Sequence, residues 1–145
     1  LMKQFLNVKT FDILHNEESE LKPLMQQADC LSIHIPNIND NISFIDSQKL
    51  SWMKSGAALI NTARGPIVNE DALYVELKNK RLIAAFDVFW QEPYCGKLKE
   101  FFPDLFFMTP HVAGTCDGFL VGCRNDLNRL IQDLCPYYKP YYMID

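Results

Sequence analysis

The sequence lacks the features that mark several large classes of protein. Its five cysteines are an odd number and include no CxxC pair, which argues against a disulfide framework and against a structural zinc site. It has no run of basic residues and its net charge is -4, which argues against nucleic acid or an anionic membrane as a partner. No apolar stretch approaches the length of a membrane span. We therefore expect no bound metal, and free thiols favour a reducing compartment, the cytoplasm.

The length and composition are those of one ordinary domain. The chain has 145 residues, of which 48% are hydrophobic and 22% charged, and this balance supports a packed core. It begins with Leu1 rather than methionine, so the lack of a visible targeting signal carries no weight. We predict a domain over residues 1–134 and a tail over 135–145 that is too rich in proline for a helix.

Short apolar runs alternate with amphipathic segments along the chain. Strands are predicted over 8–13, 29–36, 57–61, 82–89 and 105–109. Helices are predicted over 17–27, 45–53, 69–80 and 115–134, with Pro23 shortening or kinking the first of them. This order predicts an α/β domain in which a parallel sheet has helices on both faces.

The chain is organised around residues 57–66, which start as an apolar strand and turn polar within three residues. Arg64 follows, and the pair Gly65 and Pro66 then turns the chain. Asn69 can cap the next helix. Arg64 therefore lies in a strand-to-helix loop at the carboxyl end of a buried strand, where open α/β sheets bind ligands. The alternative is a solvated loop cation.

Other polar residues also follow strand ends, and they are Asp12, His34, Asp87 and His111. Taken singly, Asp12 fits a ribose ligand or an ordinary turn, and for His34 we favour a hydrogen-bonded packing role. The carboxyl ends of parallel strands share one edge, however, so these side chains and Arg64 are expected to converge on one crevice.

The residue types suit an anionic substrate that gains or loses a proton at oxygen. An arginine offers a planar fork for a carboxylate, and a histidine can pass a proton near neutral pH. Glu92 bonded to that histidine would raise its pKa and fix its tautomer. With a nicotinamide nearby, the reaction would be hydride transfer to a 2-keto acid.

Five segments in order resemble the nucleotide-binding domain of the D-isomer-specific 2-hydroxyacid dehydrogenases. They are residues 31–36, 53–57, 60–65, 87–93 and 109–114, within a similarity that covers roughly residues 8–119. The resemblance implies a Rossmann-like fold, NAD as cofactor, a small 2-keto or 2-hydroxy acid as substrate, and a homodimer. Asp12, with no adjacent arginine, favours NAD over NADP.

The resemblance also implies residue roles. The catalytic residues would be Arg64, which binds the substrate carboxylate, His111, the acid or base, and its partner Glu92. The cofactor-binding residues would be Asp12, His34, Pro36, Thr62, Ala63, Arg64, Asp87, His111 and Gly114.

The family's first strand and its G-x-G-x-x-G loop have no counterpart after Leu1. We therefore expect an N-terminally truncated domain, a fragment with little or no activity alone. That first strand is central in the order 3-2-1-4-5-6, so its loss predicts a gap between two halves of the sheet. The alternatives to an enzyme are an NAD(H)-binding regulatory or dimerisation module without turnover, as in NADH-sensing co-repressors, and a structural remnant.

Overall fold

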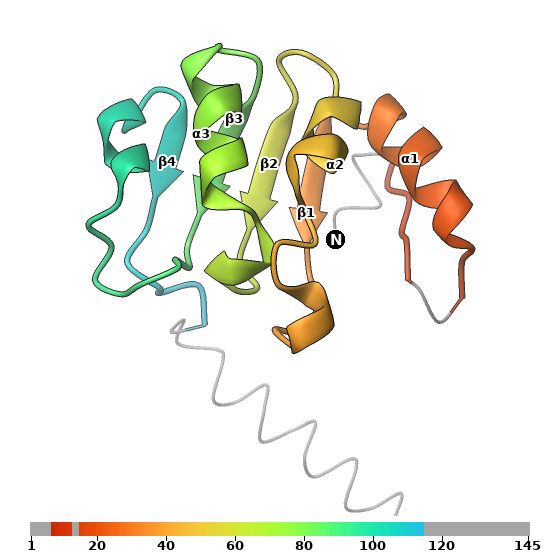
Figure 1. Ribbon diagram of the computed structural model, residues 1–145, viewed down its shortest axis with the longest axis horizontal. Helices are drawn as coiled ribbons and strands as arrows, with labels where there is room; N and C mark the ends of the chain where they lie inside the picture. The colour runs from red at the N-terminus through yellow and green to blue at the C-terminus, as the bar shows by residue number, and fades with distance from the viewer. Residues whose placement is uncertain (1–6, 13–14, 115–145) are drawn as a thin grey trace, which may run out of the picture. The chain divides into compact units, whose positions relative to one another are not determined.

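Four short parallel strands form one sheet in the structure, a computed structural model that describes residues 7–12 and 15–114 (Figure 1). They are β1 (Cys30–Ile33), β2 (Ala58–Asn61), β3 (Ile83–Phe86) and β4 (Phe106–Met108), and they lie across the sheet in sequence order. The chain divides into two units, Leu1–Pro110 and His111–Asp145. All four strands, and the three α-helices of the described residues, belong to the first unit.

One face of the sheet builds the hydrophobic core. The strand register sets Leu59, Ala84 and Phe106 side by side, and all three are fully buried. They belong to one apolar cluster with residues of α2 (Ser47–Trp52) and α3 (Glu70–Lys78), the two helices drawn in front of the sheet in Figure 1. This packing fixes the carboxyl ends of the strands along one edge.

The helices of the first unit pack as one layer. α1 (Glu18–Gln27) packs on α2, and α2 packs on α3. On the opposite face of the sheet Ile83 is 44% exposed and Phe107 52% exposed. The described helices therefore cover one face of the sheet, whereas helices were predicted on both. The helix predicted over 115–134 lies outside the described residues.

Two predictions about the sheet are wrong. Residues 7–12 are irregular rather than a strand, and Ile13 lies outside the described residues. Within the described residues no strand pairs with the outer edge of β1, and an isolated strand has no ladder of hydrogen bonds to hold it. The predicted gap is absent too, because β1 pairs directly with β2 along four residues. Each crossover places the next strand beside the one before it.

The three described α-helices lie where helices were predicted, although their ends differ. Asn69 caps α3 by accepting a hydrogen bond from the N–H of Ala72 at 2.9 Å, as predicted. Asp46 caps α2, which is shorter than predicted because Ile45 pairs with Val68 in a β-bridge instead. α1 continues through Pro23 to Gln27, so the proline does not shorten it. Pro23 is exposed, and the carbonyl that loses its helical partner can bond to water.

Tyr94 ties the segment after β3 to the start of α3. Its hydroxyl donates to Glu70 Oε1 at 2.6 Å and accepts from the N–H of Leu98 at 3.2 Å. Burial, and then the bond to Glu70, raise the pKa of the Tyr94 hydroxyl above its ordinary value. The folded protein therefore holds this proton more tightly than the unfolded chain does.

We expect Tyr94→Phe to lower the free energy of unfolding by about 1–2 kcal/mol at pH 7, because the Glu70 carboxylate loses its donor. Since the folded pKa is raised, the contribution of Tyr94 is fully present below the unfolded pKa of about 10 and is lost as the pH rises above it. Urea unfolding between pH 7 and 11 should therefore show the two proteins converging at high pH. Parallel curves across this range would contradict the prediction.

Candidate functional site

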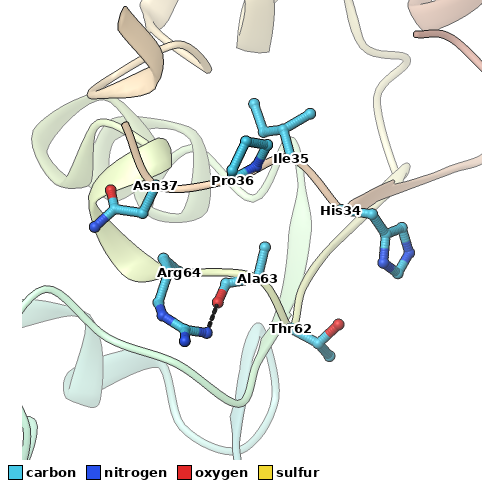
Figure 2. A pocket seen from close by; sticks show the side chains of 7 residues that line it. All are labelled: His34, Ile35, Pro36, Asn37, Thr62, Ala63 and Arg64. Carbon is cyan, nitrogen blue, oxygen red and sulfur yellow. Dashed lines mark hydrogen bonds between the residues drawn. The ribbon is translucent and has the colours of Figure 1, made fainter. Parts of the chain in front are cut away.

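An open cleft lies where β1 and β2 end (Figure 2). One wall follows β1 and the other follows β2, and together they consist of His34, Ile35, Pro36, Asn37, Thr62, Ala63 and Arg64. The cleft has a volume of ≈ 690 Å³, within the range of small-molecule sites. Its place at the carboxyl ends of two adjacent parallel strands is the place where open α/β sheets bind ligands.

The wall that follows β2 is held by a buried amide. Asn61, the last residue of β2, is fully buried. Its Oδ1 accepts from the N–H of Ala63 at 3.0 Å, and its Nδ2 donates to the carbonyl of Arg64 at 2.9 Å. The exposed guanidinium of Arg64 donates from Nη1 to the carbonyl of Ala63 at 2.6 Å (Figure 2). The buried amide of Asn61 therefore fixes the backbone of the loop that carries Arg64.

The wall that follows β1 is also held by local hydrogen bonds. His34 places Nε2 2.8 Å from Ser32 Oγ, so it is hydrogen-bonded as predicted. It is exposed rather than packed in the core, so the packing part of that prediction is wrong. The side chain of Asn41 donates to the carbonyl of Pro36 at 2.8 Å. These bonds hold the chain as it leaves β1 and passes over the cleft.

Gly65 brings two loops into close contact. A Cβ on Gly65 would lie 2.1 Å from the carbonyl carbon of Phe89 and 2.4 Å from the backbone nitrogen of Trp90. Only a residue without a side chain allows the two backbones to pack this closely. Loop 89–92 is itself closed by Glu92, whose Oε1 accepts from the N–H of Phe89 at 3.1 Å. Gly65 therefore sets the spacing between the Arg64 loop and the loop that carries Glu92.

Asp87 connects three strands at the same edge. It follows β3 and is 5% exposed. Its Oδ1 accepts from Thr109 Oγ1 at 2.5 Å, and its backbone N–H donates to the carbonyl of Asn61 at 3.1 Å. The carboxylate is thereby fixed in place at the end of β3, although it does not line the cleft.

The remaining predicted site residues lie elsewhere. Asp12 is exposed in the irregular segment 7–12, and its carbonyl accepts from the N–H groups of His15 and Asn16. The prediction that it ends a strand is wrong, and it does not line the cleft. His111, with a left-handed φ of 56°, and Gly114 are exposed residues of the second unit. The convergence seen at the cleft concerns the first unit alone.

Five of the predicted residues are therefore brought to one cleft, and they are His34, Pro36, Thr62, Ala63 and Arg64. Two residues that support the site, Asn61 in the turn over residues 62–64 and Thr109 beside Asp87, were not among the predicted site residues. Asn61 could have been found from the sequence, because it is the polar residue that ends an apolar run. Thr109 could be recognised only through its contact with Asp87, which is 22 residues away in the sequence.

Within residues 7–12 and 15–114, no three or more His, Cys, Asp or Glu side chains gather as they would around a metal ion. The same residues contain no helix with the length and apolar character needed to cross a bilayer.

A parallel sheet with a cleft at the carboxyl ends of its strands defines a ligand-binding domain of the open α/β class. The family model described as "D-isomer specific 2-hydroxyacid dehydrogenase, NAD binding domain" matches residues 3–113. The chain belongs to this family, and the resemblance stated from the five segments is confirmed.

Known relatives share this region of the sequence. The chain is 40% identical over 95 residues to (S)-sulfolactate dehydrogenase of Chromohalobacter salexigens, covering 65% of this chain and 31% of that protein. It is 40% identical over 100 residues to glyoxylate reductase of Thermofilum pendens, covering 67% of this chain and 29% of that protein. The chain thus spans about a third of the length of the curated relatives it matches.

Solved structures show the same fold. Apo D-mandelate dehydrogenase of Rhodotorula graminis aligns with a TM-score of 0.65 and 30% identity, over 77% of this chain and 33% of that one. D-lactate dehydrogenase of Aquifex aeolicus, complexed with NAD and lactic acid, aligns with a TM-score of 0.63 and 26% identity, over 80% of this chain and 40% of that one. The Rossmann-like fold is therefore confirmed.

Proposed function

We propose that this chain is the NAD-binding part of an NAD-dependent oxidoreductase that interconverts a D-2-hydroxy acid and a 2-keto acid. The observation that carries the proposal is the cleft, in which Arg64 faces the segment after β1 across the ends of two parallel strands. Family membership supports it, as do relatives named glyoxylate reductase and glycerate dehydrogenase.

The residues of the cleft fit a dinucleotide. Ile35 and Pro36 give one wall an apolar surface, while Thr62 and Ala63 give the other a hydroxyl and backbone groups. Asp87, fixed by Thr109, would accept a hydrogen bond from the carboxamide of the nicotinamide. When bound, that ring would supply or accept the hydride. Asp12 would hold the adenosine ribose, and His34 and Gly114 would lie beside the cofactor.

The substrate would be held and protonated by side chains of this chain. The guanidinium of Arg64 has five N–H donors. The bond to the carbonyl of Ala63 is made from Nη1. The remaining donors would bind the substrate carboxylate in a planar fork. His111 would give a proton to the carbonyl oxygen during reduction and take it back during oxidation, with Glu92 as its partner.

The first experiment is calorimetric. NADH is titrated into the protein expressed from its native gene, and oxamate, an unreactive analogue of a 2-keto acid, is then titrated with NADH at saturation. We expect NADH to bind, NADPH to bind more weakly, and oxamate to bind only after NADH. A protein expressed from the native gene that binds neither nucleotide would overturn the proposal.

Turnover is tested on the protein expressed from its native gene, with its intact mass measured before the assay. Phosphohydroxypyruvate, glyoxylate, hydroxypyruvate, pyruvate and longer 2-keto acids would be assayed with NADH. Oxidation of NADH with at least one of them supports the enzyme. A protein that binds NADH and oxidises it with none of them would instead be a binding or dimerisation module. Sedimentation of the same sample tests the homodimer, and fractionation tests the proposed cytoplasmic location.

A further inference from the structure

Asn61 is a buried polar residue in an apolar setting. Among the described residues the core holds two buried polar or charged side chains, and Asn61, with no exposed surface, is the more deeply buried of them. The strand register places it beside Ile33 of β1 and Phe86 of β3. An apolar side chain would satisfy the packing at this position, so the amide needs a separate explanation. Burying an amide is costly unless its groups are hydrogen-bonded.

The oxygen and the nitrogen of this amide both bond to the loop after β2, and neither bonds to the neighbouring strands β1 and β3. Oδ1 accepts from the N–H of Ala63, and Nδ2 donates to the carbonyl of Arg64. The sheet uses the backbone instead, since the carbonyl of Asn61 accepts from the N–H of Asp87 at 3.1 Å. The side chain thus closes the turn over residues 62–64 from its buried side, and three of the lining residues of the cleft belong to that turn.

The geometry points to Asn61 as a positioning residue for Arg64. It fixes the backbone on both sides of the arginine's Cα, and so fixes the point from which the guanidinium reaches a ligand. A loop that is already ordered loses less entropy when a ligand binds. The part of this inference that concerns a carboxylate ligand rests on the proposed function, whereas the part that concerns the loop does not.

The test uses Asn61→Leu in the protein expressed from its native gene, because leucine keeps the branching at Cγ and suits the apolar neighbours. Asn61→Ala, which removes both hydrogen-bonding groups of the amide, is the second variant in case leucine impairs folding. Asn69→Ala is the matched control, since it removes an asparagine that caps α3 and lies outside the cleft.

Two quantities are measured. Amide hydrogen exchange, followed by NMR, should become about tenfold faster at Ala63 in both Asn61 variants, because that N–H loses its acceptor. The dissociation constant of oxamate, with NADH at saturation, should rise about tenfold as the arginine loses its fixed starting point. Asn69→Ala should change neither quantity, although it destabilises α3.

The two parts of the inference fail separately. Unchanged exchange at Ala63 in both Asn61 variants overturns the positioning role, whatever happens to ligand binding. Faster exchange at Ala63 with unchanged oxamate affinity overturns the link to Arg64. Faster exchange in a chain whose wild type binds no oxamate supports the loop-fixing role and counts against the proposed function instead.

Discussion

Gly65→Ala should be the most damaging single-methyl change in the described part of the chain, lowering the free energy of unfolding by about 3 kcal/mol or more. The new Cβ would lie 2.1 Å from the carbonyl carbon of Phe89 and 2.4 Å from its oxygen. These are backbone atoms next to a packed core, so no side-chain rotation relieves the clash. One of the two loops must move, and the contact between the Arg64 loop and loop 89–92 is lost.

Urea unfolding measures the stability, and oxamate affinity with NADH at saturation measures the loop displacement. Gly114→Ala is the matched control for stability, since its Cβ would meet no atom within 4 Å; it should change the free energy of unfolding by less than about 0.5 kcal/mol. A Gly65→Ala protein with wild-type stability would show that the two backbones separate freely. The described packing of these loops would then be wrong.

The local elements could be predicted because their signals are local. Each of the four strands lies inside an apolar run that a polar or turn-forming residue ends, and α3 begins at its predicted asparagine cap. The strands are shorter than the runs because a strand extends only as far as its neighbours can pair with it. The predicted strand over 8–13 failed for the same reason. Its sequence suits a strand, but pairing requires a partner.

Strand order could not be predicted from local signals. The expected gap came from placing the missing strand between two halves of the sheet, whereas β1 pairs directly with β2. A crossover of given length can place the next strand beside its predecessor or further away. Packing of the whole sheet decides between these outcomes, so the sequence of a single crossover does not.

The site was predictable in its position but not in its supports. Arg64 follows an apolar run and precedes a Gly-Pro pair, so its place at a strand end could be inferred without knowing the fold. The bonds of Asn61 depend on how the next three residues turn. The need for Gly65 depends on the backbone of Phe89, 24 residues later, which approaches it only after the core has formed.

Arg64→Met should weaken oxamate binding about a hundredfold, measured calorimetrically with NADH at saturation so that loss of cofactor does not contribute. The carboxylate would lose two charge-assisted hydrogen bonds worth about 1.5 kcal/mol each. Stability should stay within about 0.5 kcal/mol of wild type, because the side chain of Arg64 is exposed and its guanidinium donates to the carbonyl of the neighbouring residue, Ala63.

Arg64→Lys separates charge from geometry. An ammonium keeps the positive charge but presents no planar fork, so its oxamate affinity should fall between those of wild type and Arg64→Met. Lys99→Met removes the same charge from an exposed residue outside the cleft and should leave oxamate affinity unchanged. If Lys99→Met weakened binding as much as Arg64→Met, the effect would be one of net charge. If neither weakened it, the carboxylate would bind elsewhere, and the role assigned to Arg64 would be wrong.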